Sequence, residues 1–195
     1  MKVETVRLFV AIELPAETRR ALVGVMDTLR AKLRSPFRWV APEALHLTLK
    51  FIGETEKNLV PRLAQAVQDA AAETQPFRIH LSGAGVFPGR GSPRVVWAGL
   101  DGDTKALSAL QTAVEKLLAD TGARPEKVPF RPHITIARVT DRLSPKVTAA
   151  IQRSLEQVAF SEHDAFVVDS VSLIHSTFTA NGPVYKTLDK VPLRQ

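Results

Sequence analysis

The chain has 195 residues, a hydrophobic content of 45%, a charged content of 24% and a net charge of +6 at pH 7, which is ordinary for a soluble globular protein of one large domain or two small lobes. It contains no cysteine, which excludes a disulfide framework, a thiol nucleophile and Cys-ligated zinc or iron–sulfur sites. The basic excess suits a polyanionic partner such as RNA, although no block of like charges forms a nucleic-acid-binding tail.

We predict that strands and helices alternate in the first half of the chain. The apolar run near its start is too short for a signal peptide or a membrane span, so we expect a cytoplasmic protein. Helical spacing places Leu59, Leu63, Ala66, Val67 and Ala70 on the inner face of the second helix. In chain order we predict a strand at residues 7–14, a helix at 17–33, extended chain from 39 into a strand with a first histidine motif, a helix at 59–73, and strands at 77–87 and 95–100.

The second half follows a similar order. A helix is predicted over residues 103–121, with Asp103 as its acidic cap and an inner face of Leu107, Leu110, Val114 and Leu117. A strand with a second histidine motif, a helix at about 144–158 and strands at 166–176 and 184–188 come next. This order predicts an α+β protein, with two pseudo-symmetric lobes of antiparallel sheet, helices on their outer faces and an active-site cleft between them. We expect residues 1–195 to form a single bilobal domain in which each lobe contributes one histidine motif.

These two motifs are both His-x-Thr-x sequences, HLTL at residues 46–49 and HITI at 133–136. Each lies in an apolar, strand-like run, and the side chains of a strand alternate between its faces. His46 therefore shares a face with Thr48, roughly 7 Å along the strand, and His133 shares one with Thr135. Near neutral pH, one imidazole can accept a proton while another donates one, and hydroxyls can bind phosphate oxygens. The pair predicts a site for phosphoryl transfer.

Other chemistries fit the sequence less well. Two histidines without a nearby carboxylate are too few ligands for a metal site, and no Gly-x-Ser-x-Gly sequence supplies a serine nucleophile. The segment GAGVFPGRG lacks the Lys-Ser/Thr of a nucleotide-binding loop, so we interpret it as a hairpin rim whose Arg90 and Arg94 can reach an RNA backbone. His80, His163 and His175 have no partner motif, and we do not include them in the predicted site.

The segments RLFVAIELP, HLTLKFIGE, PHITIAR and GPVYKTL are distributed over essentially the whole chain. In them the sequence resembles the two-histidine (2H) phosphoesterase superfamily, and more narrowly the RNA 2′,3′-cyclic phosphodiesterases, also called 2′-5′ RNA ligases. The resemblance implies two related lobes with the histidines in the cleft between them, no metal and no cofactor. It also implies hydrolysis of a 2′,3′-cyclic phosphate to a 2′-phosphate, and a weak reverse ligation to a 5′-hydroxyl through a 2′-5′ linkage.

The same resemblance implies roles for individual residues. His46 would donate a proton to the departing 3′ oxygen, and His133 would accept one from water. Thr48 and Thr135 would hold the phosphate. Arg138 matches a phosphate-binding arginine of the second motif, although strict alternation along the strand places it on the face opposite His133.

Two more residues are candidates for substrate contacts. Lys50 falls on the His46 face by alternation and would add a positive charge. Phe9, in the matched RLFVAI segment, would stack on the terminal base, and a place in the core is the equal alternative. The expected partner is RNA with 2′,3′-cyclic phosphate ends, tRNA fragments among the candidates, and we expect a monomer that binds no membrane. Two other functions stay open, a phosphoesterase for small cyclic nucleotides and a non-catalytic RNA-end-binding module.

Overall fold

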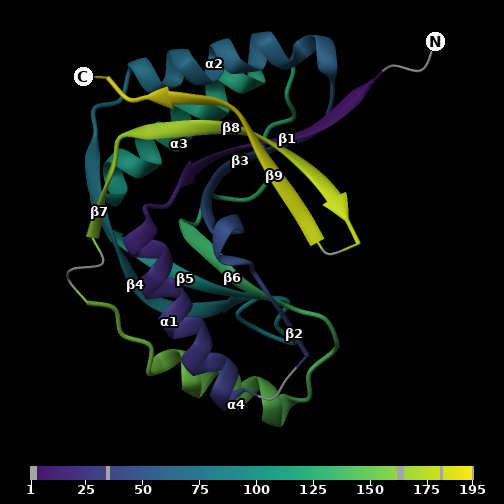
Figure 1. Cartoon of the computed structure of the whole chain (residues 1–195), viewed down its shortest axis with the longest axis vertical. Helices are drawn as coiled ribbons and strands as arrows, with labels where there is room; N and C mark the ends of the chain where they lie inside the picture. The colour runs from purple at the N-terminus through teal and green to yellow at the C-terminus, as the bar shows by residue number, and fades with distance from the viewer. Residues whose placement is uncertain (1–3, 34–35, 162–164, 181, 195) are drawn as a thin grey trace.

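The structure is a computed structural model that describes residues 4–33, 36–161, 165–180 and 182–194. In this part of the chain, nine strands form one sheet in the order β7-β4-β5-β6-β3-β1-β8-β9, with β2 paired to β6. Figure 1 shows that the sheet is strongly curved, with β8 and β9 toward one end and β4 and β5 toward the other. The strands are β1 (Thr5–Glu13), β2 (Phe37–Trp39), β3 (His46–Glu56), β4 (Phe77–Phe87), β5 (Val95–Gly102), β6 (His133–Val139), β7 (Ala165–Val168), β8 (Ser170–Thr179) and β9 (Gly182–Pro192).

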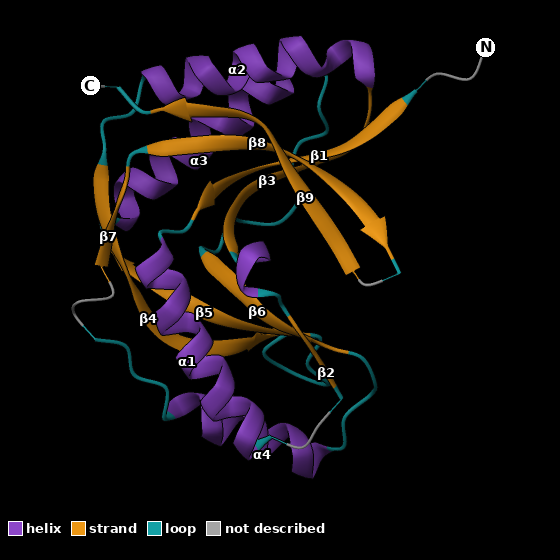
Figure 2. Cartoon of the chain, in the orientation of Figure 1, coloured by secondary structure: helices purple, strands orange, loops and turns teal. Residues whose placement is uncertain are grey.

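The α-helices of the described residues pack in two pairs. Helix α2 (Val60–Ala72) packs against α3 (Thr104–Ala119) and contacts β8 and β9. Helix α1 (Ala16–Lys32) packs against α4 (Pro145–Glu156), and α4 contacts β4. Figure 2 shows the two pairs at opposite ends of the molecule. Each pair joins a helix from the first half of the sequence to a helix from the second half. Neither end of the molecule is therefore built from one half of the chain alone.

Two helices begin at capping residues that the sequence supplies. The Asp103 carboxylate accepts a hydrogen bond from the backbone N–H of Ala106 at 3.0 Å, as the predicted acidic cap requires. The Ser144 hydroxyl accepts one from the backbone N–H of Val147 at 3.4 Å, ahead of α4. Both side chains satisfy N–H groups that the first turn of a helix leaves without a partner.

The two ends of the sheet meet where β3 lies beside β6. Leu47 of β3 pairs with Ile134 of β6 in an antiparallel arrangement, and both side chains are fully buried. These are the strands that carry the His-x-Thr-x sequences. The fold therefore brings two segments that are distant in sequence to neighbouring positions at the centre of the sheet.

Strand β1, next to β3, is buried on both of its faces. Val10 belongs to the main core between the sheet and the helices. Phe9 and Ala11 point to the opposite face and form a small cluster with Ile174, against which Tyr185 of β9 packs. This second cluster supports the face of the sheet that carries the histidines.

The predicted α+β class, with antiparallel strands and helices against the sheet, is confirmed. The single strand predicted over residues 166–176 is wrong, because Asp169 separates β7 from β8. Strand β7 pairs with β4 and β8 pairs with β1, so the two strands lie in different parts of the sheet. Apolar periodicity cannot detect a break of one residue between two apolar strands. The single bilobal domain over residues 1–195 stays a prediction.

Two leucines differ from the predicted inner faces of the helices. Leu59 lies in a short 3-10 turn ahead of α2 (Lys57–Leu59) and is 37% exposed. Leu117 of α3 is only partly buried, and its neighbour Leu118 is fully buried instead. Adjacent leucines satisfy the same helical spacing almost equally well, so packing against the rest of the protein decides which one turns inward.

Candidate active site

The two motifs meet side by side on one face of the sheet. Because Leu47 pairs with Ile134 in an antiparallel register, the residues one step away on each strand also lie opposite each other. This register places His46 next to Thr135 and Thr48 next to His133. All four side chains are half-buried, whereas their apolar neighbours are buried on the other face. The predicted alternation of the motifs is confirmed.

Both imidazoles are held in the same way by the backbone two residues upstream. The Nδ1 atom of His46 lies 2.7 Å from the carbonyl oxygen of Ala44, and the Nδ1 atom of His133 lies 2.7 Å from that of Arg131. A carbonyl oxygen can only accept, so each Nδ1 carries the hydrogen. In either protonation state, Nε2 is therefore the atom that is free to exchange a proton.

Aromatic rings surround His46. Its ring centroid lies 4.9 Å from that of Phe9 and 5.2 Å from that of Tyr185, which meets it edge-on at 89°. Phe9 is only 3% exposed, so it offers almost no face to a nucleic-acid base. The prediction that Phe9 stacks on the substrate is therefore corrected, and its ring packs against the imidazole instead.

Charges and burial act together on His46. Burial lowers the pKa of its imidazole below the ordinary value, and the charges of Arg138 and His133 lower it further. The hydrogen bond to the Ala44 carbonyl and the carboxylate of Glu13 act in the opposite direction. Because the lowering effects dominate, His46 is mainly neutral at pH 7 in the free protein.

Glu13 is a site residue that was not predicted from the sequence. It pairs with His46 across β1 and β3, and directly opposite residues of an antiparallel pair point to the same face. The Thr187 hydroxyl donates a hydrogen bond to its carboxylate at 2.9 Å. Nothing in the local sequence around Glu13 indicates this position, which only the strand pairing reveals.

A cavity of about 400 Å³ opens beside His133. Thr48 and His133 line it together with three aromatic residues, Phe51, Phe87 and Phe130. Phe51 is 56% exposed, and Phe87 meets the His133 ring edge-on with the centroids 5.0 Å apart. Apolar ring faces thus lie next to an imidazole and a hydroxyl, and none of the three phenylalanines was among the site residues predicted from the sequence.

A register shift in β3 changes the predicted position of Lys50. Ala11 pairs with Thr48 and Val10 pairs with Lys50, which leaves Leu49 as a bulge that reverses the alternation. Lys50 therefore turns into the core on the Val10 side and is 1% exposed. The prediction that Lys50 contacts the substrate is corrected.

The buried ammonium of Lys50 has partners in and after α3. Its Nζ lies 2.7 Å from a carboxylate oxygen of Glu115 and 2.9 Å from the carbonyl oxygen of Arg124. The other oxygen of Glu115 accepts a hydrogen bond from the backbone N–H of Glu126 at 2.8 Å. These bonds tie the first motif strand to α3 and to the loop that follows it.

A matching register shift in β6 settles the orientation of Arg138. Thr135 and Ala137 pair with consecutive residues of β5, which leaves Ile136 as the bulge. After this bulge, Arg138 points to the same face as His133, although strict alternation placed it on the other. Its effect on the pKa of His46 agrees with this placement.

The remaining histidines lie away from this constellation. His80 pairs with Asp101 of β5, and His175 pairs with Lys186 of β9. His163 lies outside the described residues. Among the described residues, no three His, Asp or Glu side chains are grouped so that they could hold a metal ion, and no helix is long and apolar enough to cross a membrane.

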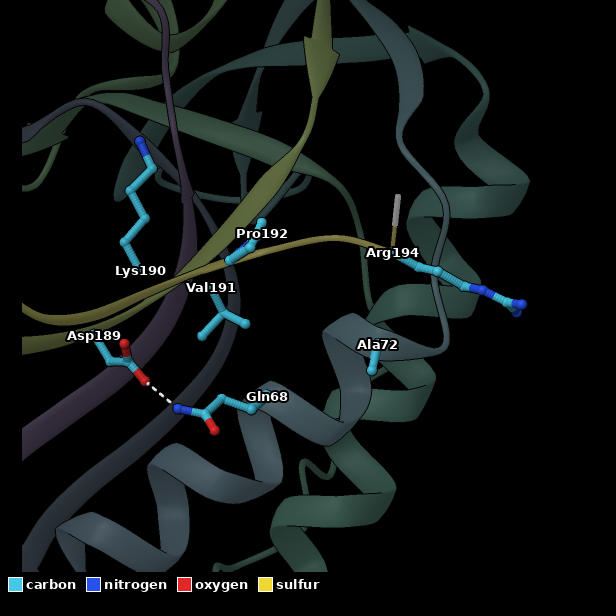
Figure 3. Close-up of a pocket in the computed structure, with 7 residues that line it drawn as sticks. All are labelled: Gln68, Ala72, Asp189, Lys190, Val191, Pro192 and Arg194. Carbon is cyan, nitrogen blue, oxygen red and sulfur yellow. Dashed lines mark hydrogen bonds between the residues drawn. The ribbon is translucent and has the colours of Figure 1, made fainter.

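Another hollow lies between α2 and the end of β9, shown in Figure 3. The Gln68 side-chain amide donates a hydrogen bond to the Asp189 carboxylate at 2.9 Å and joins the helix to the strand. The side chain of Arg194 points away from this pair (Figure 3). No histidine lines this hollow, and the hydrogen bond between Gln68 and Asp189 serves the contact between α2 and β9.

Comparison with known proteins identifies the family. A profile of the 2′-5′ RNA ligase superfamily matches residues 15–177. The RNA 2′,3′-cyclic phosphodiesterase of Thermus thermophilus is 36% identical over 195 residues, which cover 96% of this chain and 90% of that protein. The protein of the same name from Aeropyrum pernix is 34% identical over 173 residues, which cover 87% and 96%. The chain belongs to the 2′-5′ RNA ligase superfamily, as its sequence predicted.

Solved structures share the fold over nearly the full chain. The Thermus thermophilus protein TT0787 superimposes with a TM-score of 0.78 at 33% identity, covering 96% of this chain and 98% of that one. Escherichia coli LigT, solved in complex with 3′-AMP, gives a TM-score of 0.77 at 28% identity, covering 98% and 100%. The fold described above is therefore the fold of LigT-like phosphoesterases.

Proposed function

We propose that this protein hydrolyses the 2′,3′-cyclic phosphate at the 3′ end of RNA to a 2′-phosphate, by general acid–base catalysis between His46 and His133. The observation that carries the proposal is the pairing of the motifs, which places two imidazoles and two hydroxyls on one face of neighbouring strands. The relatives named RNA 2′,3′-cyclic phosphodiesterase support the same activity and substrate class.

Each histidine has one part in the reaction. His133 accepts a proton at Nε2 from a water molecule as the water oxygen attacks the phosphorus. His46 begins the reaction protonated at Nε2 and donates this second proton to the 3′ oxygen as the bond between the 3′ oxygen and phosphorus breaks. The products are a 2′-phosphomonoester and a free 3′-hydroxyl, and exchange with solvent restores both imidazoles. The choice of donor and acceptor follows the family resemblance.

Thr48, Thr135 and Arg138 stabilise the phosphate. Both hydroxyls lie on the histidine face, where they can donate hydrogen bonds to the non-bridging oxygens as negative charge grows on them. The Arg138 guanidinium supplies a positive charge on the same face. A bound phosphate in turn offsets the effect of Arg138 on His46, which favours the protonated donor once substrate is present.

The aromatic cavity beside His133 is suited to the terminal nucleoside. A base has two apolar faces that stack on aromatic rings, and Phe51 and Phe87 present such rings next to the phosphate site. Because every base has these faces, the cavity favours no particular base. Phe51 takes the role that was predicted for Phe9 from the sequence.

The same groups can run the reverse reaction, in which an RNA 5′-hydroxyl replaces water and a 2′-5′ linkage forms. Water competes for the phosphorus, so hydrolysis dominates. The site needs no metal ion in this scheme, because two imidazoles move both protons, two hydroxyls bind the phosphate oxygens and the Arg138 guanidinium offsets the phosphate charge. We place the reaction in the cytoplasm and assign it to a monomer.

A short RNA with a 2′,3′-cyclic phosphate end, incubated with excess chelator, tests the proposal. The wild type is compared with His46→Ala and His133→Ala, and His80→Ala serves as the matched control because it removes a histidine outside the site. We expect a 2′-phosphate product from the wild type and from the control, and its loss in both site variants.

Other outcomes separate the alternatives. Turnover that requires added metal would remove the metal-free mechanism. Hydrolysis of small cyclic nucleotides, with RNA ends left intact, would change the substrate class. Binding of the RNA end without turnover would leave a binding module in place of an enzyme.

A further inference from the structure

A second, larger cavity adjoins the histidine site at the end of β6. It has a volume of about 810 Å³, within the range of ligand-binding clefts, and lies between the β4–β5 loop and residues 138–142. Arg94, Arg138 and Arg142 line it, together with the single carboxylate of Asp141. We call it the arginine groove. None of the groups assigned to proton transfer or base binding lines it.

The positive charge at this groove extends to β2. Arg38 pairs with Arg138 across β2 and β6, so the two guanidiniums leave the sheet on the same face, and both residues are exposed. Like charges directly opposite each other in a sheet are destabilising. In the described part of the chain, no carboxylate forms an ion pair with Arg38, Arg94, Arg138 or Arg142. Such a cluster is suited to bind an anion with several charges.

Arg138 connects this groove to the chemistry. It lines the groove, and it also lies close enough to His46 to lower the pKa of that imidazole. One guanidinium thus belongs to both sites. Successive phosphates of one nucleic-acid strand could therefore occupy the groove and the histidine site at the same time.

We propose that the arginine groove, together with Arg38 beside it on β2, binds the phosphates of the RNA strand on the 5′ side of the cyclic end through Arg38, Arg94 and Arg142. This inference rests on the proposed function and deepens it, because it makes the preferred substrate an oligoribonucleotide instead of a cyclic mononucleotide. A mononucleotide has only the phosphate that Thr48, Thr135 and Arg138 stabilise. An oligonucleotide adds phosphates that arginines neutralise with release of counterions.

The variant Arg38→Gln/Arg142→Gln tests the groove without changing the histidine site. Its control is Arg78→Gln/Arg153→Gln, which removes the same charge from exposed positions on β4 and α4. Hydrolysis is measured with 2′,3′-cyclic AMP and with an octaribonucleotide that ends in a 2′,3′-cyclic phosphate. We expect the groove variant to have a KM for the octamer about tenfold above that of the wild type. Its KM for 2′,3′-cyclic AMP should stay within about twofold of the wild-type value, as should that of the control variant.

Salt dependence gives a second measure. Each phosphate neutralised on a single strand contributes about 0.7 to the slope of log affinity against log salt, so the groove variant should lose about 1.4 from the wild-type slope for the octamer. An unchanged KM and slope for the octamer would overturn the proposal. Equal losses for both substrates would also overturn it, because they would place the arginines at the reacting phosphate.

Direct binding keeps this test separate from the test of the proposed function. Fluorescence anisotropy with a labelled octamer that ends in a 2′-phosphate needs no turnover. If the wild type hydrolyses neither substrate, the proposed function fails. Weaker binding by the groove variant than by the control would then still support the groove as an RNA-binding surface, and equal binding would refute it.

Discussion

Single residues set the protonation of His46, which must carry a proton to act as the donor. Glu13 lies opposite it and raises its pKa, against the larger effect of burial. Glu13→Gln should therefore lower the pKa of His46 further. A donor is lost as pH rises through its pKa, so a lower pKa should reduce kcat/KM on the alkaline side of the pH profile. Profiles measured with 2′,3′-cyclic AMP check this reduction.

The same profiles decide which histidine is the donor. If His46 were the acceptor, lowering its pKa would instead raise kcat/KM on the acid side and leave the alkaline side unchanged, and the roles of His46 and His133 would be exchanged. The profile of kcat reports the bound complex, where the phosphate charge favours the protonated imidazole, so its alkaline limb should lie at higher pH than that of kcat/KM. Glu43→Gln, an exposed carboxylate in the turn before β3, is the control.

The threonine hydroxyls are tested by removing them without changing the shape of the side chain. Thr135→Val should lower kcat about 100-fold, the usual cost of one lost donor to a developing oxyanion, and Thr48→Val should act similarly. Thr135→Ser keeps the hydroxyl and should retain most of the activity. Equal losses in the valine and serine variants would indicate a packing role for Thr135 in place of hydrogen bonding.

At the scale of elements, the sequence predicted the two motif strands but not the bulge at the end of each motif. Alternation over four residues was enough to place both histidines and both threonines. It failed at the fifth position, because each strand bulges at the last residue of its motif, Leu49 in one and Ile136 in the other. Neither bulge has a glycine to mark it. Lys50 therefore turned into the core, and Arg138 onto the histidine face.

The buried ion pair between β3 and α3 gives a prediction about stability. The Lys50 side chain has no exposure, whereas that of Glu115 is 23% exposed. Glu115→Gln leaves a buried charge without its partner and should cost about 3 kcal/mol of unfolding free energy. Lys50→Met leaves a carboxylate that water reaches, so it should cost less. Urea unfolding measures both, and a larger loss in Lys50→Met would contradict this assignment of the buried charge.

At the scale of the whole molecule, the chain crosses repeatedly between the two ends of the sheet. Strands β7 and β8 follow each other in sequence but pair with β4 and β1, and α1 from the first half packs against α4 from the second. No single division of the sequence into two segments assigns one end of the sheet to each segment. The sequence could not show this crossing, because strand and helix patterns carry no information about which strands become neighbours.

This crossing predicts that the molecule unfolds as one unit. Both tryptophans, Trp39 and Trp97, lie in β2 and β5, whereas Leu110 is fully buried in α3 beside β3. Leu110→Ala should cost about 3 kcal/mol and should shift the urea midpoint equally by tryptophan fluorescence and by far-UV circular dichroism. The exposed substitution Lys105→Ala on the same helix should shift neither. A tryptophan transition that stays at the wild-type midpoint would show that the two ends unfold independently, and the histidine site would then join two separately stable parts.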